Sequence, residues 1–107
     1  MVIYDIYGFQ SDNLDGIAEE LEAILNLEWI PHSSSFRGDY YKTDKISEES
    51  FTLQHNYFEL EDEWMQPNFK IYQTLLYVDS TQRAKDIESL ILKYGKYNVA
   101  LLSRKSL

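Results

Sequence analysis

The residues of this chain that could perform acid–base or nucleophilic chemistry are two histidines and a run of serines. His32 and His55 stand 23 residues apart, and the run Ser33–Ser35 follows His32 directly. Two histidines can supply a general acid and a general base, and a base beside a serine can activate it as a nucleophile. However, no nucleophile-elbow motif and no glycine pair typical of an oxyanion hole accompanies them. We therefore expect no catalytic residue and no enzyme activity.

The sequence also contains no clear motif for a metal or cofactor site. The run 59–63 is rich in carboxylates, but it lacks the spaced ligands and the turn glycine of a calcium loop. The chain has no cysteine, which excludes a disulfide, a thiolate metal site and a cysteine nucleophile. Its four glycines are widely separated and form no phosphate-binding loop. We expect no metal and no cofactor.

The charge of the chain is distributed unevenly. The net charge is -8, the first 36 residues carry seven acidic residues and no Lys or Arg, and six of the ten basic residues follow position 80. Nucleic-acid affinity comes largely from Lys and Arg that neutralise phosphates, so direct binding of nucleic acid is not expected. An acidic surface attracts a basic protein and raises its association rate. Solubility is the simpler interpretation of the same charge.

Aromatic residues are the second unusual feature. Nine Tyr, five Phe and two Trp exceed what a core of this size needs, and Tyr and Trp are favoured at protein interfaces. A second acidic cluster lies among such rings between residues 57 and 64, and the tyrosine pair at 40–41 sends one ring to each face of a strand. The predicted partner-binding residues are Asp39, Tyr40, Tyr41, Glu59, Glu61, Asp62, Glu63 and Trp64.

Strands and loops must position these residues. The patterns of β-branched, aromatic and turn residues predict strands at 2–9, 27–30, 39–42, 51–55, 71–78 and 97–102. Pro31 ends the second strand or places it at a sheet edge, and the serines at 33–35 with Gly38 mark a loop or bulge. Residues 56–70 are expected to form a long acidic and aromatic loop, and such loops are usually functional or ordered by their own side chains.

Two helices are expected. The first follows cap candidates at 11–13, where Asp12 and Asp15 resemble a capping box, and the second follows possible caps at 79–81 and ends near Gly95. The acids Glu19, Glu20 and Glu22 cover the outer face of the first helix and offer an alternative binding surface. The apolar stripes that we expect to be buried are Leu14, Ile17, Ala18, Leu21, Ile24 and Leu25 on the first helix, and Ala84, Ile87, Leu90, Ile91 and Tyr94 on the second.

The order of these elements predicts the fold class. Two strand–helix–strand units flank a hairpin formed by 39–42 and 51–55, within a single domain over residues 1–107. This order is typical of an α+β protein, and we expect a ferredoxin-like split βαβ sandwich. In it, an antiparallel sheet would carry two helices on one face and an inserted β-hairpin. The start of the chain has no secretory signal pattern and no apolar run could span a membrane, so we expect a cytoplasmic protein.

Several segments resemble a known family. They are 5–9 with Ser11 and Asp12, the stretch 32–41, 51–54 with Asn56, and 75–78 with Arg83 and Ala84. Together they are similar to the immunity proteins of bacterial contact-dependent growth inhibition, within the branch that is paired with ribonuclease A-like toxins. The resemblance runs over most of the chain. The segment 58–69 departs from it, because it has no glycine, so contacts of that loop transfer least.

The resemblance implies a function. The protein would be a cytoplasmic inhibitor that binds a cognate basic toxin domain, a nuclease and most simply an RNase, in a one-to-one complex and blocks its active site. It carries over no catalytic residue and implies no membrane partner. Two other classes remain open from the residues alone. One is a ferredoxin-like regulatory domain that binds a small ligand or dimerises, and the weaker one is a small hydrolase that uses His32 or His55.

Overall fold

The structure is a computed structural model that describes residues 2–35, 38–44 and 48–107. Phe36 and Arg37, which belong to the stretch 32–41 named above, lie outside the described residues. The elements in chain order are β1 (Ile3–Phe9), α1 (Leu14–Leu25), β2 (Trp29–Ser34), β3 (Gly38–Thr43), β4 (Ser50–His55), β5 (Tyr57–Phe58), β6 (Glu63–Trp64), the 3-10 helix η1 (Pro67–Phe69), β7 (Thr74–Thr81), α2 (Ala84–Tyr94) and β8 (Val99–Ser106).

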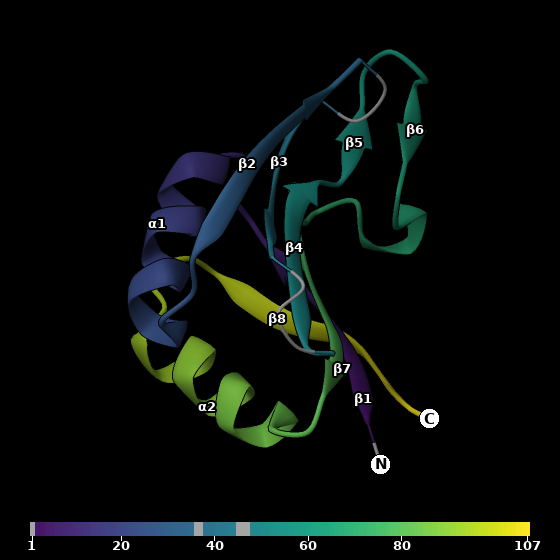
Figure 1. Cartoon of the computed structure of the whole chain (residues 1–107). Coiled ribbons are helices and arrows are strands. Elements are labelled where there is room, and N and C mark those ends of the chain that lie inside the picture. The colour runs from purple at the N-terminus through teal and green to yellow at the C-terminus, as the bar shows by residue number, and fades with distance from the viewer. Residues whose placement is uncertain (1, 36–37, 45–47) are drawn as a thin grey trace.

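Six of the strands form one sheet in the order β2-β3-β4-β7-β1-β8, and every neighbouring pair in it is antiparallel. Both helices lie on the same side of this sheet, and β5 and β6 form a separate two-stranded ribbon on the other side (Figure 1). The α+β class is therefore confirmed. The predicted hairpin also forms, because β3 pairs with β4. It is not a peripheral insertion, however: β4 lies beside β7 within the sheet, and β2 forms the edge.

The first helix begins one residue later than its predicted capping box requires. Asn13, one of the cap candidates at 11–13, is the N-cap, and its Oδ1 accepts a hydrogen bond from the Gly16 N–H at 3.1 Å, so the cap is not the Asp12 of the predicted capping box. The helix ends at Asn26, whose left-handed φ of 54° is one that Asn tolerates. Its predicted stripe is confirmed with one adjustment, since Ile24 is only partly buried; the buried residues are Leu14, Ile17, Ala18, Leu21 and Leu25.

The second helix differs more from its prediction. The predicted caps at 79–81 belong to β7, which continues through Thr81, and helix α2 starts at Ala84. Thr81 still assists the start of the helix, because its Oγ1 accepts a hydrogen bond from the Arg83 N–H at 3.1 Å. The buried stripe consists of Ala84, Ile87 and Ile91 with Leu90 packed against it, but Tyr94 is 54% exposed. The prediction for Tyr94 was wrong because Tyr94 is the last residue of the helix.

The boundaries of several strands differ by a few residues from those predicted. Strand β2 runs through Ser34, so two of the three serines expected in a loop belong to the strand, and Pro31 lies on an edge strand as predicted. Strand β7 occupies the interior of the sheet as expected, but it begins at Thr74, and Ile71 before it is 64% exposed. Strand β8 starts at Val99 rather than at Tyr97.

A buried ion pair fastens β1 to the edge strand β8 and to α2. Asp5 of β1 is 1% exposed, and its two carboxylate oxygens accept hydrogen bonds from Nε and Nη2 of Arg104 at 2.9 and 2.8 Å. The same Nη2 lies 2.9 Å from Oε1 of Glu88 on α2. The pair between Arg104 and Asp5 is bidentate, which suits the planar guanidinium. Together with Glu88 it joins β1, β8 and α2 beneath the helix layer.

The segment 56–73, of which 56–70 was predicted as a loop, is ordered by its own contacts. It contains β5, β6 and η1 and lies away from the helices (Figure 1). The Tyr72 ring packs against β1 at Gly8, where an added Cβ would come within 2.6 Å of the Tyr72 Cγ. Only a glycine lets the Tyr72 ring come this close to the backbone of β1, so β1 provides the surface on which the segment packs. Within the described residues, no helix is long and apolar enough to cross a membrane.

Candidate functional site

The structure separates the two histidines. His32 of β2 is directly opposite Tyr40 of β3, and Tyr40 is opposite Gln54 of β4, so these three side chains share one face of the sheet. The His32 and Tyr40 rings stack with their centroids 5.0 Å apart. His55 follows Gln54 in the strand and therefore points to the other face, toward the helix layer. The two histidines cannot act as a pair of general acid and base.

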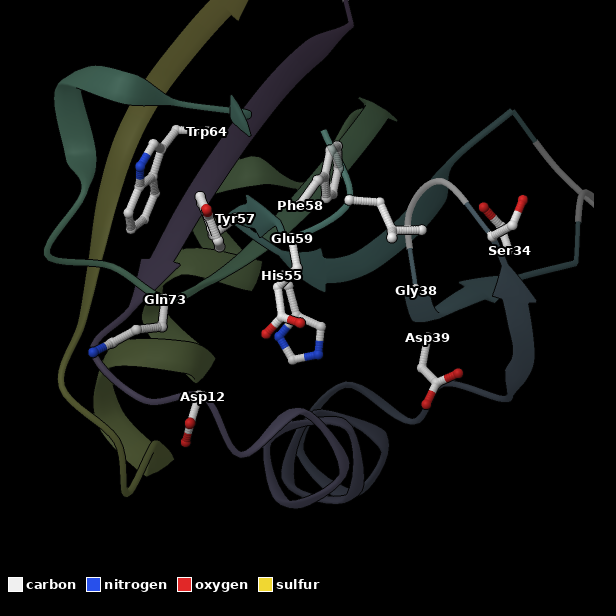
Figure 2. A pocket seen from close by; sticks show the side chains of 12 residues that line it. Asp12, Ser34, Gly38, Asp39, His55, Tyr57, Phe58, Glu59, Trp64 and Gln73 are labelled. Carbon is white, nitrogen blue, oxygen red and sulfur yellow. The ribbon is translucent and has the colours of Figure 1, made fainter. Parts of the chain in front are cut away.

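His55 instead lines a cavity of about 670 Å³, a volume within the range of ligand sites. It lies between the β5–β6 ribbon, the adjoining ends of β2 and β3, and the turn that leads from β1 into α1 (Figure 2). We call it the acidic cavity. Its lining consists of Asp12, Ser34, Ser35, Gly38, Asp39, His55, Tyr57, Phe58, Glu59, Leu60, Trp64 and Gln73.

Three carboxylates from distant parts of the sequence meet at the acidic cavity. Asp12 precedes α1, Asp39 lies in β3, and Glu59 follows β5. Among the described residues, no Lys or Arg lines the cavity, and none forms an ion pair or side-chain hydrogen bond with these three carboxylates. Their negative charges are therefore not neutralised by the described part of the chain.

One wall of the acidic cavity is aromatic. Tyr57 and Trp64 are cross-strand partners in the β5–β6 ribbon, with ring centroids 5.0 Å apart and an interplanar angle of 48°. Figure 2 shows these rings and Phe58 on the side opposite Asp12 and Asp39. Such pairs stabilise short strands, which are marginal on their own. The wall is thus a small structured ribbon and not a mobile loop.

Residues 57–64 form what we call the acidic hairpin. The Tyr57 hydroxyl donates a hydrogen bond to Oδ1 of Asp62, and this bond raises the pKa of Tyr57 because it favours the protonated phenol. Asp62 has a left-handed φ of 50° at the tip, where Leu60 is 76% exposed between acidic neighbours. The hairpin therefore presents an apolar side chain within a ring of negative charge.

Asn56 anchors the acidic hairpin from below. This residue is fully buried, its Nδ2 donates to the carbonyl oxygens of Phe69 and Tyr72 at 3.1 and 2.9 Å, and its Oδ1 accepts from the Gln66 N–H at 2.8 Å. Its backbone N–H and C=O bond to Gln73 and Met65 as well. The chain leaves the sheet at the end of β4, and the Asn56 side chain there satisfies backbone groups that are no longer paired between strands.

The structure brings together only part of the predicted binding face. Asp39, Glu59 and Trp64 line the acidic cavity, and Glu61, Asp62 and Glu63 are exposed on the acidic hairpin beside it. Tyr40 lies on the opposite face of the sheet against His32. Tyr41 points toward the helices, where its hydroxyl donates to Oδ1 of Asp15 and its ring lies 6.1 Å from that of Trp29. Tyr41 therefore fastens α1 to β3.

Sequence reasoning missed four important members of the site. Asp12 was interpreted as a helix cap, His55 was considered only as a catalytic residue of the hydrolase alternative, and Tyr57 and Phe58 were considered only as neighbours of the acidic run. Ser34 and Ser35 join them in the lining, but no hydrogen bond connects His55 to either serine in the described structure. The alternation of β4 placed His55 on the helix side, which is the one signal that could have assigned it to this cavity.

Metal binding is not supported by the geometry. No group of three or more His, Cys, Asp or Glu side chains in residues 2–35, 38–44 and 48–107 is arranged to hold a metal ion. The carboxylates of the acidic cavity are therefore spread around its rim and do not converge on a single point.

The chain was compared with known proteins. No protein-family model matches it, and no curated protein shows a significant match.

Proposed function

We propose that this protein is an immunity protein that binds a toxic nuclease domain in the cytoplasm and blocks its active site in a one-to-one complex. The observation that carries the proposal is the acidic cavity, which combines an aromatic wall with three carboxylates that no described residue neutralises. The family resemblance of the sequence points to the same function and to a ribonuclease A-like partner.

The chemistry of the partner explains why such a cavity would inhibit it. A domain that cleaves RNA must hold phosphates, and it does so with Lys and Arg side chains. Carboxylates that occupy these basic positions exclude the substrate. An acidic surface also steers the basic partner during encounter, which favours rapid capture of a toxin.

The acidic hairpin suits the binding role because it is ordered before binding. A flexible loop would lose conformational freedom on association, and this loss would weaken the complex. Here three contacts hold the hairpin in place: the hydrogen bonds of Asn56, the ring contact between Tyr57 and Trp64, and the packing of Tyr72 on Gly8. Leu60 at the exposed tip is the apolar group that would insert into a cleft of the partner.

We also propose that the fold is a ferredoxin-like split βαβ sandwich with an added hairpin. The strand order β4-β7-β1-β8, with α1 after β1 and α2 after β7, supports this assignment. In this interpretation β4 completes the first unit, and the β2–β3 hairpin is the addition, which extends the sheet beyond β4.

Co-expression with ribonuclease A-like toxin domains tests the function. The proposal predicts that the protein restores growth of cells that express its cognate toxin, and that the purified protein inhibits RNA cleavage by that domain in a one-to-one ratio. Failure to bind or inhibit any toxin of this class would refute it. Turnover of a substrate by the purified protein, abolished in His55→Ala, would replace it with the hydrolase alternative.

A charge-matched pair of variants tests where the partner binds. Glu61→Gln with Glu63→Gln should slow association several-fold at low salt and much less at high salt, because exposed charges are screened within about 8 Å at physiological ionic strength. The control, Glu19→Gln with Glu22→Gln, removes equal charge from the exposed face of α1 and should have little effect. Glu20 is spared, because its Oε1 accepts the Lys96 N–H at 2.7 Å. The reverse pattern would move the interface to the helix.

A further inference from the structure

We propose that the acidic cavity is the receptor for one arginine side chain of the partner protein. This inference rests on the proposed function, and it goes beyond it by naming the group that enters the cavity and the residues that receive it. The guanidinium would lie against the aromatic wall formed by Tyr57 and Trp64 and would donate hydrogen bonds to the carboxylates of Asp39 and Glu59.

The charge of the cavity requires a cation. Asp12, Asp39 and Glu59 are exposed residues that lie around one half-open cavity of about 670 Å³, and within the described structure none of the three carboxylates is paired. Like charges that share a concave site repel one another, and the walls focus their field into the cavity. A positive group that enters would relieve this repulsion.

The spread of the carboxylates favours an organic cation over a metal ion. Among the described residues, no three ligand-type side chains are close enough to coordinate one ion. A guanidinium is planar and offers five N–H donors in fixed directions, so it can reach carboxylates on two sides at once. A lysine ammonium is a compact point charge and would satisfy fewer of them.

The aromatic wall adds a second reason for arginine. A guanidinium plane stacks on aromatic faces and gains cation–π attraction. The Trp64 ring already engages a cation in the free protein, since Nζ of Lys70 lies 5.6 Å from its centroid. Lys70 does not line the cavity, and Trp64 does. Figure 2 shows Tyr57 and Trp64 across the cavity from Asp12 and Asp39.

Short peptides provide a direct test that does not need the toxin. Calorimetric titration with a tetra-arginine amide should show saturable binding at low salt, with tetra-lysine at least fivefold weaker and tetra-citrulline not bound. Asp39→Asn with Glu59→Gln should weaken tetra-arginine binding at least tenfold. The charge-matched control Glu19→Gln with Glu22→Gln should change it less than twofold. Thermal unfolding of each variant establishes that it is folded.

The outcomes separate this inference from the proposed function. Equal binding of tetra-arginine by the cavity variant and its control, or equal binding of tetra-citrulline, would overturn the arginine receptor. So would full neutralisation of the cognate toxin by Asp39→Asn with Glu59→Gln, although the immunity function would then stand. Specific arginine binding by a protein that neutralises no toxin would uphold the receptor and refute the immunity function.

Discussion

Asn56 offers the sharpest test of how the site is held together. Asn56→Ala removes three hydrogen bonds from a side chain that is fully buried, and it leaves the Gln66 N–H and the Tyr72 carbonyl oxygen without these partners, whereas the Phe69 carbonyl oxygen still accepts the Tyr72 N–H at 3.0 Å. At about 1 kcal/mol net for each bond, with more for stranded groups that water cannot reach, segment 57–73 should lose about 3–5 kcal/mol of local stability.

Hydrogen exchange measures this loss where it occurs. Because 1.4 kcal/mol corresponds to a factor of ten, amide protection in segment 57–73 should fall by about two to three orders of magnitude in Asn56→Ala. Global stability should fall less, since the segment can open and hydrate its stranded groups while the sheet stays folded. Asn98→Ala, at an exposed asparagine, is the matched control.

A second variant distinguishes hydrogen bonding from side-chain volume. Asn56→Asp keeps the shape and the acceptor for Gln66, but it turns a carboxylate oxygen toward the carbonyl oxygens of Phe69 and Tyr72. It should therefore destabilise the segment at least as much as Asn56→Ala. Unchanged protection of 57–73 in both variants would refute the view that Asn56 anchors the acidic hairpin.

Three further predictions concern the rest of the fold. Asp5→Asn should lower the free energy of unfolding in urea by about 3 kcal/mol, the low end for a broken buried ion pair, because Arg104 keeps a second carboxylate partner; a loss below 1 kcal/mol would contradict this. Leu76→Ala, at a fully buried position, should cost about 2–5 kcal/mol by the same measurement, and a near-neutral effect would place Leu76 outside the core. Hydrogen bonding to Arg83 holds the pKa of Glu49 below its usual 4.5, so this stabilisation is present above pH 4.5 and is lost as the pH falls through the lowered pKa. The difference in stability between the protein and Glu49→Gln should therefore shrink below pH 4.5, and a constant difference in pH-dependent denaturation would count against it.

Local patterns in the sequence predicted much of the fold. The stripe of α1 repeats over three turns, and the strands β1 and β7 are rich in β-branched and apolar residues, so short windows were enough to identify them. Their ends were harder to place. Residues 71–73 continue the apolar pattern of β7, but Asn56 and Gly8 hold Tyr72 in a different conformation, and neither contact is visible locally.

The acidic cavity could be predicted only in part. The acidic run 59–63 and its aromatic neighbours drew attention by composition alone. The meeting of Asp12, Asp39 and Glu59 depends on the register of three strands and on the turn before α1, which one sequence does not specify. Strands of two residues, such as β5 and β6, leave no periodic signal, so the hairpin that forms the wall was expected as a loop.

The position of β1 in the sheet determines when the sheet can form during synthesis. This strand pairs with β7 and β8, which leave the ribosome after the other strands of this sheet. At about 5–20 residues per second, β1 waits roughly 5–20 s with Tyr7 and Phe9 uncovered before its neighbours exist. Sheets made of such distant pairings also fold slowly, in milliseconds to seconds. A cell that depended on this domain for protection would gain it only after β8 had been synthesised, so a reserve of folded protein would have to be present before any toxin arrived.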